Sequence, residues 1–346
     1  MQKRFLYIII FMVMAAIAGG VIAGRWYNDN KRPNFTKDYI LFVRPDTPVS
    51  EVLDSLQSGA GAIRHRSLER CFEQENVAQK IKPGRYVIKP SHTSIYVSRM
   101  LACGWQTAGK LTLSGTIRTK GRLAQKIASQ MMVDSASVAQ ALDSVEFLEP
   151  YGFTPENVFA MILPDTYYMY WTASVKDIFD RLKKEYDAFW TQERLDKAKE
   201  QKLTPMQVSV LASIVSGETL KSFEYPRIAG VYLNRYRKGM RLQADPTVAF
   251  CFNYEPDRIL KKHLQVDSPY NTYKYAGLPP APINVPPKAC LEAVLSPENN
   301  KYIYFCASPD FDGTHRFAVG YNEHLKNARE FQRALTKRNK ERAAQK

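Results

Sequence analysis

The residue in this sequence best placed to do chemistry is Glu218, a carboxylic acid that ends an apolar stretch. Val208, Leu211 and Val215 precede it at spacings of three and four, so all four side chains are expected on one helix face. A carboxylate on an apolar face is costly unless it is paired or protonated. An acid kept protonated near neutral pH can act as a general acid. The simpler alternative is a solvated glutamate at a helix end, because acids are common on exposed surfaces.

The segment that must position this acid has clear helix signals. Thr204 is a favourable N-cap, and Pro205 falls at the first helical position, where its missing N–H costs nothing. Gly217, beside the acid, is a weak helix former, and glycine often lets another segment approach closely. The sequence therefore predicts a helix that starts at Pro205 and carries Glu218 in its second half.

Further polar side chains that could serve the acid lie downstream, in segments expected to be loops. The stretch 268–282 is rich in Tyr, Asn, Gly and Pro, which is typical of an irregular, surface-facing loop. Such side chains could bind a polar substrate or orient the acid. Alternatively, they hold the loops together through Asx turns and tyrosine hydrogen bonds. The candidates are Gln243, Asp245, Asn271 and Tyr273.

The N-terminus predicts a membrane segment. The run 5–23 contains no charged residue, and its nineteen residues would span roughly 28 Å as a helix, close to the hydrocarbon thickness of a bilayer. Lys3 and Arg4 favour a cytoplasmic N-terminus, although Arg25 on the far side weakens that assignment. The alternative is a cleaved signal peptide, with 21–23 as its cleavage site. In both cases we expect the rest of the chain to be exported.

The composition indicates a basic protein that can build sizeable cores. The chain has 346 residues, 45% of them hydrophobic, and 49 Lys and Arg against 34 Asp and Glu give a net charge of +15. This charge suits nucleic acid, anionic lipid or a polymer with carboxylates, or it is only a well-solvated surface. The five cysteines form no CxxC motif, so a zinc site is not expected, and their odd number permits one or two disulfides.

Alternation of short strands and amphipathic helices predicts an α+β fold. After the anchor, strands at 39–43 and 86–88 enclose a helix that opens at 46–48 and a second helix over about 67–78. The larger remainder is mainly helical, with a strand at 302–305 that pairs back with 315–317. The expected parts are a cytoplasmic stub and anchor at 1–24, a tether at 25–38, a small α+β domain at 39–110, a larger helical domain at 111–328, and a basic tail at 329–346 that is helical or disordered.

Five ordered motifs resemble those of the MltG/YceG family of endolytic murein transglycosylases, and the match runs from the anchor to about residue 325. The segment 162–167 is similar to the family's LFPDTY, and 211–219 is similar to its ASIVEKET. The others are 231–235 with 239–248, similar to NR and GMRLQTDPTV; 270–273, similar to YNTY; and 277–283, similar to GLPPGPI. The resemblance also implies that the small domain at 39–110 is LysM-like.

Three departures from the family's motifs bear on the site. Ser216 replaces the first glutamate of ASIVEKET, which leaves Glu218 as the only acid of that segment. Ala281 replaces a glycine, and 114–116 reads Ser-Gly-Thr where the family has a Pro-Glu-Gly turn. We interpret the last two as differences in loop geometry. Asp165, which follows Pro164, is expected to be a helix or turn cap rather than a catalytic group.

The resemblance implies a membrane-anchored enzyme that cleaves the MurNAc–GlcNAc β-1,4 bond within peptidoglycan strands and leaves 1,6-anhydro-MurNAc ends, with termination of strand elongation as a further role. Glu218 would be the catalytic acid and then the base, while Gln243, Asp245, Asn271 and Tyr273 would bind sugar or orient it. No cofactor or metal is expected. The implied partners are peptidoglycan, the inner membrane and cell-wall synthesis proteins, with the catalytic domain in the periplasm.

Two other functional classes compete with this reading. The first is an inactive peptidoglycan-binding or cell-division scaffold, for which the replacement at Ser216 is the only support. The second is a nucleic-acid binder, suggested by charge alone; the sequence contains no helix-turn-helix, zinc-finger or RNP-type motif, and export removes the chain from nucleic acid. We therefore expect no nucleic-acid partner.

Overall fold

The computed structural model describes residues 2–344, which form helices and a few short strands in two compact units. The first unit extends from the N-terminal helix to Leu111 and also contains 130–132 and 167–173. The second unit contains 112–129, 133–166 and the chain from Ser174 to the C-terminal helix. The secondary structure agrees with the predicted mixture of helices and short strands. The continuous part of the first unit ends at Leu111, next to the expected domain boundary at residue 110.

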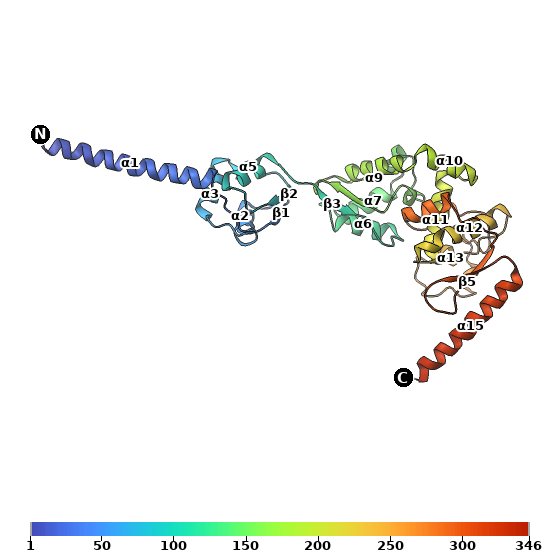
Figure 1. Cartoon of the computed structure of the whole chain (residues 1–346). Coiled ribbons are helices and arrows are strands. Elements are labelled where there is room, and N and C mark those ends of the chain that lie inside the picture. The colour runs from blue at the N-terminus through green and yellow to red at the C-terminus, as the bar shows by residue number, and fades with distance from the viewer. Residues whose placement is uncertain (1, 345–346) are drawn as a thin grey trace. The chain divides into compact units, whose positions relative to one another are not determined.

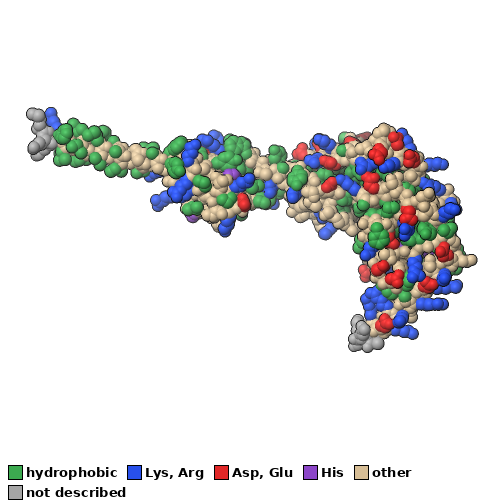
Figure 2. Space-filling view, viewed as in Figure 1, with side chains coloured by type: hydrophobic (Ala, Val, Ile, Leu, Met, Phe, Trp, Pro, Cys, Tyr) green, Lys and Arg blue, Asp and Glu red, His purple; other side chains and the backbone are tan. Residues whose placement is uncertain are grey.

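The N-terminal helix α1 (Gln2–Asn30) is long and apolar enough to cross a membrane. Its stretch Arg4–Asn30 reaches a mean hydropathy of 2.6, and the most apolar part is unburied in the protein. Figure 2 shows hydrophobic side chains along it. Length and composition alone support this assignment, and a signal sequence has the same two properties.

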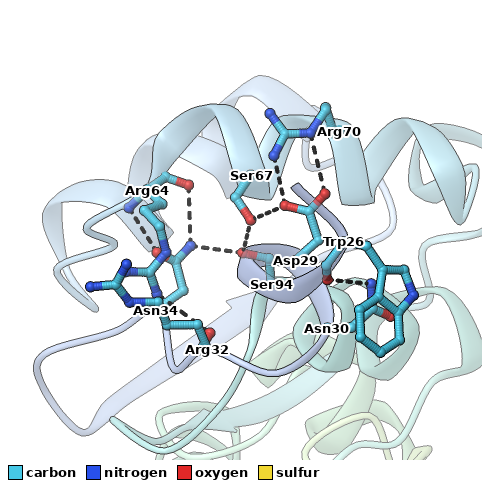
Figure 3. A network of polar contacts seen from close by, with 9 residues as sticks. All are labelled: Trp26, Asp29, Asn30, Arg32, Asn34, Arg64, Ser67, Arg70 and Ser94. Carbon is cyan, nitrogen blue, oxygen red and sulfur yellow. Dashed lines mark hydrogen bonds and ion pairs between the residues drawn. The ribbon is translucent and has the colours of Figure 1, made fainter. Parts of the chain in front are cut away.

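The expected tether at 25–38 is wrong, because this segment is built into the first unit. Helix α1 continues to Asn30, and the next residues enter the core: Asn34 is fully buried and Phe35 nearly so. Asp29 on the last turn of α1 accepts hydrogen bonds from Arg70 Nη2 at 2.7 Å and from Ser67, both on the helix His65–Gln74 (Figure 3). The apolar helix is therefore clamped to the small unit instead of being joined to it by flexible chain.

The first unit has the predicted strand–helix–helix–strand order. Strands β1 (Tyr39–Val43) and β2 (Gly84–Ile88) pair antiparallel, and the buried residues Leu41 and Tyr86 lie opposite each other. The single helix expected over 67–78 is two helices, because Asn76 adopts a left-handed conformation with φ of +54°. The helices are α2 (Val49–Ser58), α3 (His65–Gln74), α4 (Val77–Lys80) and α5 (Ser94–Cys103).

The first part of the second unit is a helical layer with charged outer faces. The charged helical stretch over 175–201 is interrupted at Trp190, after which the Thr191 side chain caps a new helix. Its charges form pairs four residues apart, such as Lys183 with Asp187, as expected for solvated faces. The helices of this part are α6 (Lys120–Ala128), α7 (Ser135–Asp143), α8 (Val145–Leu148), η1 (Glu149–Tyr151), η2 (Val158–Ala160), α9 (Val175–Phe189) and α10 (Gln192–Glu200). Strands β3 (Gly109–Thr112) and β4 (Thr166–Met169) pair with each other, and most of their residues belong to the first unit.

The core of the second unit forms around α11 (Pro205–Glu218). Every residue of this helix from 208 to 215 is buried. The predicted single apolar face is therefore too narrow, because a helix that is apolar all round lies inside the core. Figure 1 shows its neighbours among the yellow and orange segments. The helices that pack on α11 in this region are α12 (Tyr225–Arg237), α13 (Asp245–Cys251) and α14 (Lys288–Leu295), and the segments between them include η3 (Ser222–Glu224) and η4 (His263–Gln265).

The C-terminal part forms the predicted hairpin and a long helix. Strands β5 (Tyr304–Ala307) and β6 (His315–Ala318) pair antiparallel, with His315 opposite Ala307. Helix α15 (Tyr321–Ala344) contacts this hairpin through an Arg316–Glu330 ion pair at 2.5 Å and through the Phe311 and Phe331 rings. The separate tail expected at 329–346 is thus wrong at its start, because a single helix spans residue 329 and packs on the hairpin.

All five cysteines are free thiols, although the sequence permits one or two disulfides. Cys71 in the first unit and Cys290 in the second are completely buried. Each unit therefore contains one buried thiol that becomes reactive only when that unit opens.

Candidate active site

Helix α11 presents Glu218 because its two ends are well defined. The Thr204 side chain accepts a hydrogen bond from the Gln207 backbone, and the Gln207 side chain bonds back to the Thr204 backbone, so the predicted N-cap is confirmed as a capping box. The helix ends at Glu218, and Thr219 is extended. The core around α11 fixes the helix, and the acid at its end reaches the edge of that core.

Gly217 allows α13 to approach the acid, as the sequence suggested. A Cβ atom at Gly217 would lie 2.6 Å from Cβ of Pro246, which is closer than real Cβ contacts. Pro246 is the second residue of α13, and Asp245 is its first. The absent side chain at Gly217 therefore brings Asp245 next to the end of α11.

The Glu218 carboxyl is poorly compensated for a half-buried acid. Among the residues described, Tyr232 of α12 is its only hydrogen-bond partner, with the Tyr232 hydroxyl donating to Oε1 at 2.5 Å. Burial raises the pKa of Glu218 to about 7; the Tyr232 hydrogen bond opposes this shift, and the Asp245 charge adds to it. The raised pKa favours the protonated form of Glu218 near neutral pH, which is the form that can donate a proton.

Asp245 and Tyr273 form a second pair next to Glu218. The Tyr273 hydroxyl donates to Asp245 Oδ1 at 2.6 Å, and this exposed carboxylate lines a cavity together with Glu218. Burial, and to a smaller extent the hydrogen bond to Asp245, raise the pKa of Tyr273. Asp245 is thus held as a charged neighbour that favours the protonated form of Glu218.

Gln243 reaches the same cavity from a strained backbone. It adopts a left-handed conformation with φ of +53°, its N–H donates to the Thr272 carbonyl, and its Oε1 accepts from Arg235 at 3.3 Å. Arg235 also donates to the carbonyls of Ile303 and Leu242. A non-glycine residue in this region costs about 1 kcal/mol or more and persists where its surroundings enforce it.

Asn271 has the scaffolding contacts that were the alternative to substrate binding. It is fully buried, its amide donates to the carbonyls of Leu264 and Val266, and its Oδ1 accepts from the Tyr273 backbone at 3.0 Å. The expected surface-facing loop over 268–282 is therefore partly internal. Asn271 acts on the cavity through the backbone of Tyr273.

Two cavities meet at Glu218 and Asp245, and both are within the second unit. The first, about 340 Å³, is mostly polar and includes Arg118, which stacks on the Tyr254 ring at 4.9 Å. The second is about 250 Å³ and is lined by Glu218, Tyr232, Arg235, Leu242, Gln243, Asp245, Tyr273, Phe305, Cys306, Ala307 and His315. An elongated polar substrate could therefore extend to both sides of the acid.

Ser216 does not take the place of a second acid. Its hydroxyl lies 2.9 Å from both the Ser213 carbonyl and Asn284 Oδ1, and Asn284 in turn donates to that carbonyl. The serine joins α11 to the chain around residue 284. Asp165 is also occupied elsewhere, because it accepts from the Thr166 backbone and pairs with Lys288.

The structure thus places Glu218, Gln243, Asp245 and Tyr273 in one cavity and leaves Asn271 behind its wall. The sequence analysis missed three other members of this neighbourhood: Tyr232, Arg235 and His315. The first two lie on α12 and appeared only as members of the motif 231–235, without a role of their own. The histidine follows a turn at Gly313, and nothing local marks it as a site residue.

A sequence model of the YceG-like family matches residues 41–330 of the chain. An endolytic murein transglycosylase of Bacillus subtilis is 35% identical over 153 residues, covering 44% of this chain and 42% of that protein. One from Streptococcus pneumoniae is 21% identical over 359 aligned positions, covering 94% of this chain and 65% of that protein. The crystal structure of a yceG-like protein from Listeria monocytogenes superposes with a TM-score of 0.57 at 26% identity, covering 84% of this chain and 98% of that chain.

Proposed function

Since the chain belongs to the YceG-like family, we propose that it is an endolytic peptidoglycan transglycosylase with Glu218 as its catalytic residue. The relatives named endolytic murein transglycosylase support this activity, although the chain spans only 42% and 65% of their lengths. The observation that carries the proposal is a half-buried acid with a pKa of about 7 at the junction of two cavities. An acid tuned in this way can deliver and recover a proton near neutral pH.

The proposed reaction needs only this one carboxyl group. Protonated Glu218 donates its proton to the glycosidic oxygen, and the bond from C1 of MurNAc to the GlcNAc oxygen breaks. The Glu218 carboxylate then accepts the proton of the MurNAc C6 hydroxyl, while the oxygen of that hydroxyl bonds to C1 of the same sugar. This step closes the 1,6-anhydro ring, regenerates protonated Glu218 and consumes no water.

The other residues of the site have supporting roles in this scheme. Asp245, held by Tyr273, adds to the pKa shift of Glu218, and Tyr232 fixes the carboxyl through Oε1. The second carboxyl oxygen has no protein partner among the described residues and is available to the substrate. Gln243 and Tyr273 offer polar groups to sugar hydroxyls and acetamido groups, and Asn271 supports the Tyr273 backbone.

We further propose that α1 stays on the mature chain as an inner-membrane anchor, with the N-terminus in the cytoplasm and the catalytic unit in the periplasm. The clamp at Asp29 supports this, because the apolar helix and the small unit share one hydrogen-bonded network. The LysM-like identity of the small unit remains a proposal that rests on its strand–helix–helix–strand order. Termination of strand growth and contacts with cell-wall synthesis proteins belong to the same proposal.

The alternative is an inactive scaffold, and its only support is the replacement at Ser216. Ser216 bonds to Asn284, and the acid that the mechanism needs is Glu218. The decisive experiment digests peptidoglycan with the full chain in water enriched in oxygen-18 and analyses the products by mass spectrometry. We expect 1,6-anhydro-MurNAc ends without the label. Labelled reducing ends would mark a hydrolase, and unchanged strands would mark a scaffold.

A further inference from the structure

A buried acid, Glu224, is linked through Thr219 to the end of α11 and holds a histidine. Glu224 is 3% exposed, and its Oε1 accepts from the His315 backbone N–H at 2.9 Å. Its Oε2 lies 2.9 Å from His315 Nδ1 and accepts from the Thr219 hydroxyl at 3.2 Å. The carboxylate therefore orients the imidazole, and it also ties β6 to the residue that follows Glu218.

The remaining ring nitrogen of His315 is available. Ala307 and His315 are paired across the hairpin, so their side chains share a face of it with Phe305, and all three line the cavity of Glu218. The Phe305 ring packs edge-on against His315 at 5.3 Å and against Tyr232 at 5.8 Å. Among the residues that the structure describes, Nε2 of His315 has no hydrogen-bond partner, and it is not sealed off from solvent.

We propose that His315 is a substrate-contacting residue and that Glu224 is its positioning residue. With Nδ1–H directed to Glu224, Nε2 of the neutral imidazole is an acceptor on the cavity side of the ring. It takes a hydrogen bond from a hydroxyl or acetamido N–H of an N-acetylhexosamine beside Glu218. This inference rests on the proposed function for its choice of ligand.

The two ring nitrogens can be tested separately with two amide substitutions. His315→Asn keeps a polar atom near the position of Nδ1 and can still bond to Glu224, but it has nothing at Nε2. His315→Gln reaches the position of Nε2 but gives up the bond to Glu224. A purely structural histidine would tolerate asparagine better than glutamine, whereas a substrate contact would tolerate glutamine better.

The experiment measures binding of peptide-free glycan strands to the full chain in a Glu218→Gln background, so that no strand is cleaved. We expect His315→Asn to weaken binding about threefold to tenfold, the usual value of one neutral hydrogen bond. His315→Gln should bind more tightly than His315→Asn, and Glu224→Gln should lie between wild type and His315→Asn. Melting curves and the labelling rate of Cys290, which is buried in the same unit, report whether each variant is folded.

Several results would overturn the proposal. These are wild-type affinity in His315→Asn, weaker binding by His315→Gln alone, or no glycan binding by the Glu218→Gln chain. The proposed function has a separate test: it would be contradicted if the wild-type chain released no anhydro products. In cleavage by the otherwise wild-type chain, His315→Asn should raise KM by the same factor and change kcat less. If kcat instead fell by that factor and KM stayed unchanged, His315 would not contact the sugar in the ground state.

Discussion

Two buried or half-buried acids, one in each unit, have opposite environments. Asp29 is met by Arg70, which donates twice, and by the hydroxyl of Ser67. Glu218 is met by one phenol hydroxyl and faces a second carboxylate at Asp245. A charge that is fully partnered stabilises the structure around it, whereas an acid left short of partners takes up a proton. The number and charge of the hydrogen-bonding partners therefore distinguish an acid that stabilises the fold from one that can transfer a proton.

The largest expected effect is on catalysis. Glu218→Gln keeps the shape of the side chain and its bond from Tyr232 but cannot transfer a proton, so activity should fall by at least roughly a hundredfold. Glu200→Gln, at an exposed position at the end of α10, is the matched control and should remain active. The measurement is the release of muropeptides from peptidoglycan. Near-normal turnover by a folded Glu218→Gln chain would remove Glu218 from the mechanism.

The two acids should also differ in the sign of their effect on stability. Unfolded Glu218 loses its proton near pH 4.5 and folded Glu218 near pH 7, so between these values the folded state holds more protons and stability falls as pH rises. Glu218→Gln removes this cost and should stabilise the second unit by up to about 3 kcal/mol at about pH 8. The gain should vanish near pH 4.5. Slower labelling of Cys290 at high pH checks it, and an equal rate would contradict the unfavourable burial.

Loss of the partnered acid should act in the opposite direction. Asp29→Ala leaves Ser67 and Arg70 without their acceptor and should destabilise the first unit by about 2 kcal/mol. In the detergent-solubilised full chain, the buried thiol of Cys71 should then label faster, while Cys290 in the second unit should not change. Asp38→Ala, at an exposed position, is the control. Equal protection of Cys71 in both variants would mean that the clamp contributes no stability.

A smaller effect is expected from the one partner that Glu218 has. The Tyr232 hydrogen bond lowers the pKa of Glu218 against the effect of burial, so Tyr232→Phe should raise this pKa further. The loss of activity on the alkaline side should therefore move to higher pH, because the acid keeps its proton longer. The measurement is the pH dependence of kcat for both proteins. An alkaline limb that moves to lower pH would show that Tyr232 does not stabilise the carboxylate.

The smallest effect concerns surface charge, which includes Lys and Arg side chains along α15 (Figure 2). Peptidoglycan stems and anionic lipid both carry negative groups, and screening limits such attraction to about 8 Å near physiological salt. Since Glu330 and Phe331 hold the hairpin, α15 should be neutralised beyond them, at Lys340 and Arg342, instead of being deleted. We expect a weaker salt dependence of sacculus binding with unchanged saturated turnover. An unchanged salt slope would exclude this end of α15 as the contact.

Local signals in the sequence predicted several elements correctly and singled out Glu218 as the candidate acid. Thr204 and Pro205 fixed the start of α11, and strand periodicity placed β1 within the residues predicted for it. The charged stretch over 175–201 has no proline or glycine at Trp190, so its break could not be read from local rules. The tether was misread because the burial of Asp29 and Phe35 depends on partners far along the chain.

Contacts between residues far apart in the sequence also limit how much of the site could be predicted. Motif resemblance brought Gln243, Asp245 and Tyr273 near Glu218, but Tyr232 became a partner only when α12 packed on α11. The contact between Glu224 and His315 joins residues that are 91 positions apart, and no periodicity links them. The pKa shift of Glu218 likewise depends on packing that composition cannot supply.

The most direct test of the account is the ionisation of Glu218 itself. A carbon-13 NMR titration of glutamate carboxyl groups in the full chain, with Glu218→Gln used to assign the signal, measures its pKa without any substrate. We predict a midpoint at about 7, caused by burial with a single hydrogen-bond partner. A midpoint at or below the ordinary glutamate value of about 4.3 would contradict the claim that this site stores a proton for catalysis.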